Sequence, residues 1–210
     1  IDVTDIERVS GGRTFFWSGR YDYDLNTART LDTQLNVFAD FGPKLGDAAK
    51  QASTLFLGNI QPGLQQAVRS QCSEASLVAL DSMNLWIDIA RDSLIETIKG
   101  VDAVFMNDAE IRALTGQSNM LKAAREILTW GPRLVIAKQG EYGAALVTHD
   151  SFFALPAYPL EDVIDPTGAG DSFAGGFLGY ISQHLSEGGE LDDDAFRRAM
   201  TFGSTMASFN

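Results

Sequence analysis

The sequence predicts an α/β fold in which helices cover both faces of a mostly parallel sheet. From residue 54 onward, short apolar runs typical of strands alternate with longer segments of helical periodicity. The expected strands are 54–58, 77–81, 102–106, 134–138, 144–148 and 152–155, and the expected helices lie near 63–71, 87–98, 108–115, 119–129, 169–185 and 193–208. The strands at 134–138 and 144–148 form a hairpin across the turn at 139–143.

Polar residues stand at or near the ends of four of these strands. They are Asn59, Asp81, Asn107 and Lys138. Ligands of open α/β sheets collect at the carboxyl ends of the strands. The sequence therefore predicts the functional site at this edge.

The segment before residue 54 differs from the rest. Residues 14–23 are aromatic and β-prone, with Gly19 as a possible bulge, and 35–41 has partial alternation. Both are expected to be extended and to form a small sheet. The aromatic ring of Phe16 is a candidate to stack on a substrate, although most rings of the 15–17 cluster are expected to pack within the sheet.

Composition limits the function classes. The 210 residues suit one domain with a small appendage, and 45% are hydrophobic. A net charge of −12 argues against nucleic-acid binding. No apolar run is long enough to span a membrane. The one cysteine, Cys72, fits a reducing compartment, and a cytoplasmic location is expected.

Residues 165–176, with the sequence DPTGAGDSFAGG, carry the strongest functional signal. A glycine-rich turn that opens a helix leaves N–H groups free to bind an anion, most often phosphate. Asp171 lies about one turn inside that positive end. An anion site beside a carboxylate suits phosphoryl transfer to a hydroxyl, with the carboxylate as proton acceptor.

A plain turn is the alternative interpretation. Pro166 and the glycines would make a tight turn, Thr167 would be the N-cap, and the helix dipole would favour Asp171. Gly175 and Gly176 each cost about 1 kcal/mol in a helix, which the close approach of a backbone or ligand would explain. The run matches neither a Walker A loop nor a dinucleotide-binding fingerprint.

The 165–177 run resembles the C-terminal signature of the ribokinase-like, or PfkB, family of sugar and nucleoside kinases. Asn107 and Glu110 resemble the Asn-x-x-Glu element of that family, and 138–144 resembles its Lys-x-Gly-x-x-Gly hairpin. The resemblance implies a ribokinase-like three-layer α/β/α core with a small β lid. The lid would comprise 11–45, and the nucleotide-binding core 1–10 and 46–210. The family's first strands have no counterpart, so the chain is expected to be a fragment that may lack activity.

The resemblance also implies the residue roles. Asp171 would be the catalytic base, and Gly168, Ala169 and Gly170 would form the anion hole. Asn107 and Glu110 would organise magnesium and the phosphates, Glu110 through water.

The remaining nucleotide contacts are expected at Lys138, Gly140, Gly143 and Thr167, and adenine would lie near Gly203–Ala207, specifically at Gly203 and Ala207. Each has a structural alternative. Asn107 and Glu110 have the spacing of a capping box, and the glycines of the 138–143 turn can supply positive φ.

The sequence thus predicts an ATP- and Mg²⁺-dependent kinase that phosphorylates a small sugar. A nucleoside is the alternative acceptor. A non-catalytic nucleotide-binding relative and a plain dinucleotide-binding module are the alternatives from other classes. A homodimer formed through the lid is also expected.

Overall fold

The computed structural model describes residues 3–23 and 28–209. Its strands are β1 (Phe16–Tyr21), β2 (Ala28–Gln34), β3 (Thr54–Leu57), β4 (Leu77–Asp81), β5 (Ala103–Asn107), β6 (Leu134–Lys138), β7 (Ala144–Thr148) and β8 (Phe152–Leu155). Its α-helices are α1 (Asp47–Lys50), α2 (Pro62–Gln71), α3 (Asn84–Ile89), α4 (Arg91–Ile98), α5 (Asp108–Thr115), α6 (Met120–Leu128), α7 (Ala169–Ser186) and α8 (Asp193–Ala207). Two short 3₁₀ helices, η1 (Asn36–Asp40) and η2 (Gly140–Tyr142), lie in connections.

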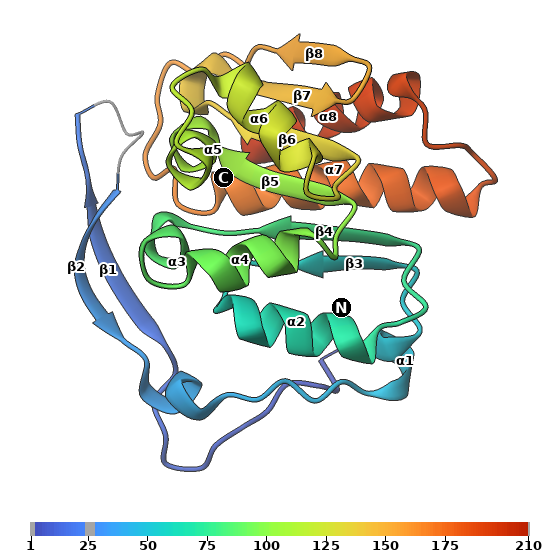
Figure 1. Ribbon diagram of the computed structural model, residues 1–210. Helices are drawn as coiled ribbons and strands as arrows, with labels where there is room; N and C mark the ends of the chain where they lie inside the picture. Colours follow the sequence, from blue (N-terminus) through green and yellow to red (C-terminus); the bar gives the residue numbers. More distant parts are fainter. Residues whose placement is uncertain (1–2, 24–27, 210) are drawn as a thin grey trace.

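The main sheet confirms the α/β prediction. Its strands run in the order β3-β4-β5-β6-β7-β8, and β3 to β6 are parallel. The expected hairpin makes β7 antiparallel to β6, and β8 is antiparallel to β7. The carboxyl ends of β3, β4, β5 and β6 therefore meet at one edge, as Figure 1 shows.

Strand alternation divides the core into two clusters, one on each face of the sheet. In β4, Val78 and Leu80 belong to the cluster that contains side chains of α4, α5 and α6. Leu77 and Ala79 belong to the cluster that contains side chains of α7 and α8. This produces three layers, with α7 and α8 alone on their face of the sheet (Figure 1). Because successive side chains of a strand point to opposite faces, residue parity decides which layer each side chain meets.

The small sheet is built differently from the prediction. β1 pairs antiparallel with β2, and the register shifts between Ser18 and Gly19, which confirms the bulge. The segment at 35–41 is not a strand but mostly the 3₁₀ helix η1. Leu35, Phe38 and Phe41 fall three apart, which suits a 3₁₀ turn, and the rings of Phe38 and Phe41 stack with centroids 5.5 Å apart.

The pairing strand β2 was missed because it carries almost no apolar signal. Its sequence, ARTLDTQ, is mostly polar. Polar side chains join the hairpin: Trp17 Nε1 donates to Thr30 Oγ1 at 3.1 Å, and Arg29 pairs with Asp22 at 2.9 Å. Residues 24–27, which the 11–45 lid prediction includes, lie outside the described residues.

One helix prediction was also wrong in detail. The single helix expected near 87–98 is two helices, α3 and α4, separated by Ala90 with φ −142° and ψ 32°. The Arg91 guanidinium donates to the carbonyl of Leu114 at 2.7 and 3.1 Å. This contact ties the start of α4 to the end of α5, and sequence periodicity carries no sign of it.

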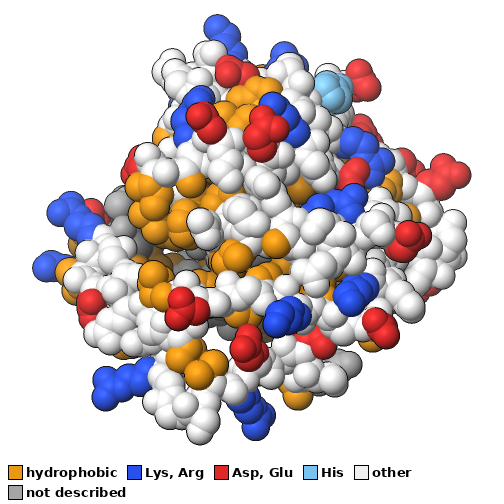
Figure 2. Space-filling model, turned by 60° about the horizontal axis from the view of Figure 1, so that its bottom comes forward, with side chains coloured by type: hydrophobic (Ala, Val, Ile, Leu, Met, Phe, Trp, Pro, Cys, Tyr) orange, Lys and Arg blue, Asp and Glu red, His pale blue; other side chains and the backbone are white. Residues whose placement is uncertain are grey.

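Apolar side chains remain exposed on the N-terminal segment and the hairpin. They include Val3, Ile6, Val9, Phe15, Phe16, Leu31 and Leu35. Figure 2 shows apolar side chains gathered on the face seen from below, with charged groups around them. Among the described residues, no helix is both long and apolar enough to cross a membrane.

Candidate functional site

The site lies where β4, β5 and β6 end beside the start of α7. In β4 and β6, Asp81 and Lys138 have the parity of the residues that face α7 and α8. Each is the last residue of its strand, and β5 lies between the two strands. The fold therefore brings together two side chains that are far apart in the sequence.

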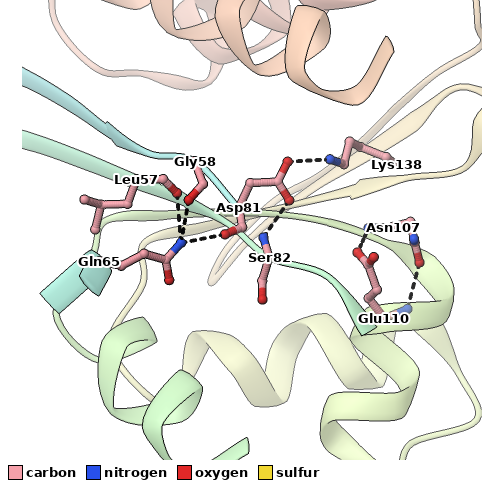
Figure 3. Close-up of polar contacts among 8 residues, drawn as sticks. All are labelled: Leu57, Gly58, Gln65, Asp81, Ser82, Asn107, Glu110 and Lys138. Carbon is pink, nitrogen blue, oxygen red and sulfur yellow. Dashed lines mark hydrogen bonds and ion pairs between the residues drawn. The ribbon is translucent and has the colours of Figure 1, made fainter. Parts of the chain in front are cut away.

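Asp81 and Lys138 form an ion pair that is almost closed to solvent. Lys138 Nζ lies 2.7 Å from Asp81 Oδ2, and their side chains are 19% and 5% exposed. The second carboxylate oxygen of Asp81 accepts a hydrogen bond from the Ser82 N–H at 2.7 Å (Figure 3). Burial raises the pKa of the Asp81 carboxyl, and the neighbouring Lys138 ammonium opposes that rise.

Gln65 holds the strand ends beneath this pair, and sequence reasoning missed it. Its Nε2 donates to the carbonyls of Leu57, Gly58 and Asp81 at 3.1, 2.9 and 2.9 Å. The side chain is buried, so these bonds replace water. Gln65 lies three residues from both Pro62 and Val68, so it shares a face of α2 with them. This spacing could have indicated that Gln65 is buried.

Asn107 and Glu110 form the expected capping box. Asn107 Oδ1 accepts from the Glu110 N–H, and Glu110 Oε2 accepts from the Asn107 N–H, both at 2.8 Å. Burial, with a further contribution from the nearby charge of Asp81, raises the pKa of Glu110 to about 7. The capping-box interpretation is confirmed, and the cap lies at the end of β5 near the ion pair (Figure 3). A role of these two residues with magnesium and phosphates stays a prediction.

The glycine-rich run forms the expected turn at the start of α7. Gly168 is the N-cap with φ +87°, a conformation that favours glycine. Thr167 is therefore not the cap; its N–H donates to Asp165 Oδ1 at 2.9 Å. Asp171 is exposed, within the first turn of α7.

The three predicted anion-hole amides differ in their availability. The Ala169 N–H donates to the Pro166 carbonyl at 3.1 Å, so in this structure the turn uses it. Within the described part of the chain, no hydrogen bond pairs the N–H groups of Gly168, Gly170 and Asp171. Two of the three predicted groups, together with the N–H of Asp171, are thus left for an anion.

Lys138 reaches this helix start. A Cβ atom added to Gly170 would lie 2.9 Å from Lys138 Nζ. The structure thus places an ammonium group against the first turn of α7.

Gly140 and Gly143 shape the β6–β7 turn, with φ of +57° and +99°. A side chain at Gly143 would also collide with the carbonyl of Leu155. These observations confirm the turn interpretation. Nucleotide contact by either glycine stays a prediction.

Gly203 and Ala207 have packing roles in this structure. Gly203 is buried in α8, and a Cβ there would lie 2.8 Å from the Phe173 carbonyl oxygen of α7. Ala207 is half-buried against the same core cluster. The smallness of Gly203 is thus explained by helix packing, and contact of either residue with adenine stays a prediction.

The lid contributes one contact to the motif. Tyr21 Oη and Thr167 Oγ1 lie 3.0 Å apart, which joins β1 to the turn before α7. Phe16 is 49% exposed on β1, and its stacking on a substrate stays a prediction.

Several other polar residues are engaged away from the site. Asn59 Oδ1 accepts from Trp86 Nε1 at 2.9 Å, and the His184 ring stacks on Tyr180. Two surface hollows, of roughly 480 and 270 Å³, lie elsewhere. One is lined by Asp5, Glu7 and residues 40–45, and the other by Arg133, residues 148–150, residues 191–193 and Phe196, so neither lining contains a predicted site residue.

Comparison with known proteins places the chain in a family. Residues 38–209 match the pfkB family of carbohydrate kinases, so the chain belongs to that family. Among solved structures, ribokinase from Thermotoga maritima is 25% identical with a TM-score of 0.70, covering 93% of this chain and 62% of that one. The ribokinase-like fold and the family resemblance are both confirmed.

Curated relatives act on different acceptors. Cytidine kinase from Thermococcus kodakarensis is 46% identical over 95 residues, which is 44% of this chain and 34% of that protein. 1-Phosphofructokinase from Haloferax volcanii is 29% identical over 164 residues, which is 75% of this chain and 50% of that protein. The matched regions thus span half or less of these two relatives.

Proposed function

We propose that the protein transfers the γ-phosphoryl group of ATP to a hydroxyl group of a small carbohydrate. The observation that carries the proposal is the start of α7. Unpaired N–H groups and the exposed carboxylate of Asp171 belong to the first turn of α7, and the Lys138 ammonium lies against Gly170 of the same turn. Family membership supports the same reaction class.

The proposed chemistry needs no covalent enzyme intermediate. The acceptor hydroxyl oxygen bonds to the γ-phosphorus while the bond from that phosphorus to the β–γ bridging oxygen breaks, and ADP leaves. The Asp171 carboxylate takes the hydroxyl proton. The N–H groups at the start of α7 and the ammonium of Lys138 stabilise the charge on the transferred group.

The residues present fit a magnesium ion held mainly by phosphates and water. The described residues contain no group of three or more His, Cys, Asp or Glu side chains arranged to hold a metal. Glu110 is a buried carboxyl beside the anion site, and one of its oxygens already accepts from Asn107. Glu110 would therefore act through water, and the ion would neutralise phosphate charge.

A nucleoside is the second candidate acceptor. The 46% identity to a cytidine kinase favours it. Phe15 and Phe16 are 43% and 49% exposed on or beside the lid, and aromatic rings of this kind can stack on a base.

Two further properties belong to the proposal. The exposed apolar side chains of the hairpin would pair two copies through their lids, which sedimentation at increasing concentration would detect. The buried, unpaired thiol of Cys72 suits a reducing compartment such as the cytoplasm.

The function is tested on the protein expressed from the complete open reading frame that encodes this sequence. ADP release is followed with a panel of free sugars and nucleosides. Asp171→Asn should lower turnover about 10²–10⁴-fold, because a positioned base contributes that factor. Nucleotide affinity should stay largely intact.

Asp194→Asn is the matched control, since Asp194 is an exposed aspartate in the first turn of the neighbouring helix α8. It should leave turnover within about twofold, because exposed ion pairs contribute little. Near-normal turnover of Asp171→Asn would show that the base is another group. Nucleotide binding with no transfer to any acceptor would favour a non-catalytic relative.

A further inference from the structure

Asp81 has no role in the chemistry proposed above, yet it is the best-held side chain at the site. Its Oδ1 accepts from the Ser82 N–H at 2.7 Å, and its Oδ2 pairs with Lys138 at 2.7 Å. Its backbone carbonyl accepts from Gln65 at 2.9 Å. A buried carboxylate that is bonded at both oxygens, on a backbone that is itself held, is a rigid anchor for the group that it binds.

The group that Asp81 binds is the Lys138 ammonium, which also lies against the start of α7. A lysine side chain has four rotatable bonds and ordinarily extends its ammonium into water. Here Lys138 Nζ is turned instead toward Asp81 and lies against Gly170. The ion pair crosses over β5 on the face that α7 covers (Figure 3).

Gly170 makes room for this arrangement. Its φ is not in the left-handed region, so the backbone alone does not require glycine there. A Cβ would lie 2.9 Å from Nζ and 3.6 Å from the Lys138 stem. The ammonium lies close to the space that a side chain at position 170 would fill.

From these contacts we propose that Asp81 is a positioning residue, which holds the Lys138 ammonium at the α7 start where it meets the transferred phosphate. The inference rests on the proposed function. Asp81 touches neither nucleotide nor acceptor and acts through Lys138. Its own negative charge would repel phosphate, so its value depends entirely on the lysine that it orients.

This dependence gives a test, because the effect of Asp81→Asn on nucleotide affinity should differ between proteins with and without Lys138. Binding of the magnesium complex of AMP-PNP, a non-hydrolysable ATP analogue, is measured by calorimetry on the full-length protein. Asp81→Asn keeps the shape and the bond from Ser82 but removes the charge. It should weaken binding about 3–10-fold, because Lys138 is then free to leave the anion site.

In a Lys138→Met background, Asp81→Asn should instead leave affinity unchanged or make it up to a few-fold tighter, because only repulsion is then removed. Equal losses in both backgrounds would overturn the proposal. So would tighter binding by the single Asp81→Asn variant. Wild-type protein that binds no nucleotide would refute the proposed function itself, and this inference with it.

A thermal melt would reveal whether Asp81→Asn fails to fold. In that case a second variant, Gly170→Ala, tests the same proposal. Gly170→Ala should displace the ammonium from the side of α7 and weaken binding, but much less so in the Lys138→Met background. Gly175→Ala is its control on the same helix, since a Cβ at Gly175 would meet nothing within 4 Å. Equal losses for Gly170→Ala in both backgrounds would count against the proposal.

Discussion

Burial changes the acidity of the Glu110 carboxyl group, whose pKa is raised. It is 7% exposed and shares the end of the sheet with the buried carboxylate of Asp81. Both acids sit beside a single ammonium, that of Lys138. With a pKa of about 7, the Glu110 carboxyl is partly protonated near neutral pH when no ligand is bound.

We expect this proton to make stability depend on pH. The pKa of Glu110 rises from 4.5 to about 7 on folding, so the folded chain binds the proton more tightly than the unfolded chain. Its contribution to stability is therefore full below about pH 4.5 and lost as the pH rises through 7. The free energy of unfolding should therefore fall between pH 5 and pH 8. Glu110→Gln, which can still accept a hydrogen bond from the Asn107 N–H, should reduce that fall by up to roughly 3 kcal/mol. Urea unfolding at both pH values, without magnesium, measures it.

Glu74→Gln, a substitution at an exposed residue, serves as the control and should show the same fall in the free energy of unfolding as the wild type. Asp81 remains in the Glu110→Gln variant, and the raised pKa of its carboxyl should leave a residual fall of the same sign. An unchanged pH dependence in Glu110→Gln would show that Glu110 is ionised throughout that range.

At the scale of elements, α7 and α8 approach closely because each offers a glycine to the other. A Cβ at Gly176 would lie 2.7 Å from Met206 Cγ, and one at Gly203 would lie 2.8 Å from the Phe173 carbonyl oxygen. A Cβ at Gly176 would also lie 2.9 Å from the Phe202 carbonyl oxygen. Backbone atoms cannot move aside as a flexible side chain can, so this close approach requires a glycine at both positions.

Gly203→Ala should destabilise the protein by about 1–3 kcal/mol, although alanine is the better helix former by about 1 kcal/mol. Gly179→Ala on α7 is the control, because a Cβ there would meet nothing within 4 Å. It should stabilise the protein by up to about 1 kcal/mol. Chemical denaturation of both variants measures the difference, and a stabilised Gly203→Ala would contradict the close packing of these helices.

The elements also show what a sequence can and cannot predict. The core strands carry dense apolar runs, so their positions and the carboxyl-end location of Asp81, Asn107 and Lys138 followed from pattern alone. β2 lacks that signal and was missed, and the apolar spacing of η1 was mistaken for alternation.

Within the site, local features were predictable and long-range contacts were not. The capping box and the glycine turns depend on neighbours in the chain, so spacing revealed them. The pair formed by Asp81 and Lys138 joins residues 57 positions apart. It depends on strand order and parity, which no local pattern encodes.

At the scale of the whole molecule, the β1–β2 hairpin, which is the predicted lid, contacts the core beside the candidate site. Two strands alone are marginally stable in water. The contact of Tyr21 with Thr167, 146 positions apart, connects the hairpin to the turn before α7. The position of the lid and the shape of the anion site are thus linked.

Tyr21→Phe should loosen the hairpin without unfolding the core. Loss of one partly exposed hydrogen bond, worth about 0.5–1.5 kcal/mol at most, should speed amide exchange in β1 and β2 by roughly 2–10-fold. Exchange in β4 to β6 should not change. Tyr158→Phe, in an exposed loop, is the control. Unaltered exchange in the hairpin would mean that the contact does not hold the lid.

The carboxylate of Asp171 and the ammonium of Lys138 belong to different layers, a helix and a strand, and no covalent or backbone link sets the distance between them. That spacing depends on how α7 packs against the sheet, including the edge-to-face contact of the Phe105 and Phe177 rings, whose centroids lie 5.4 Å apart. A small shift of α7 relative to the sheet would move the two charges apart, even if the helix and the strands stayed folded. Moderate warming should therefore lower the proposed phosphoryl-transfer activity before circular dichroism detects loss of secondary structure.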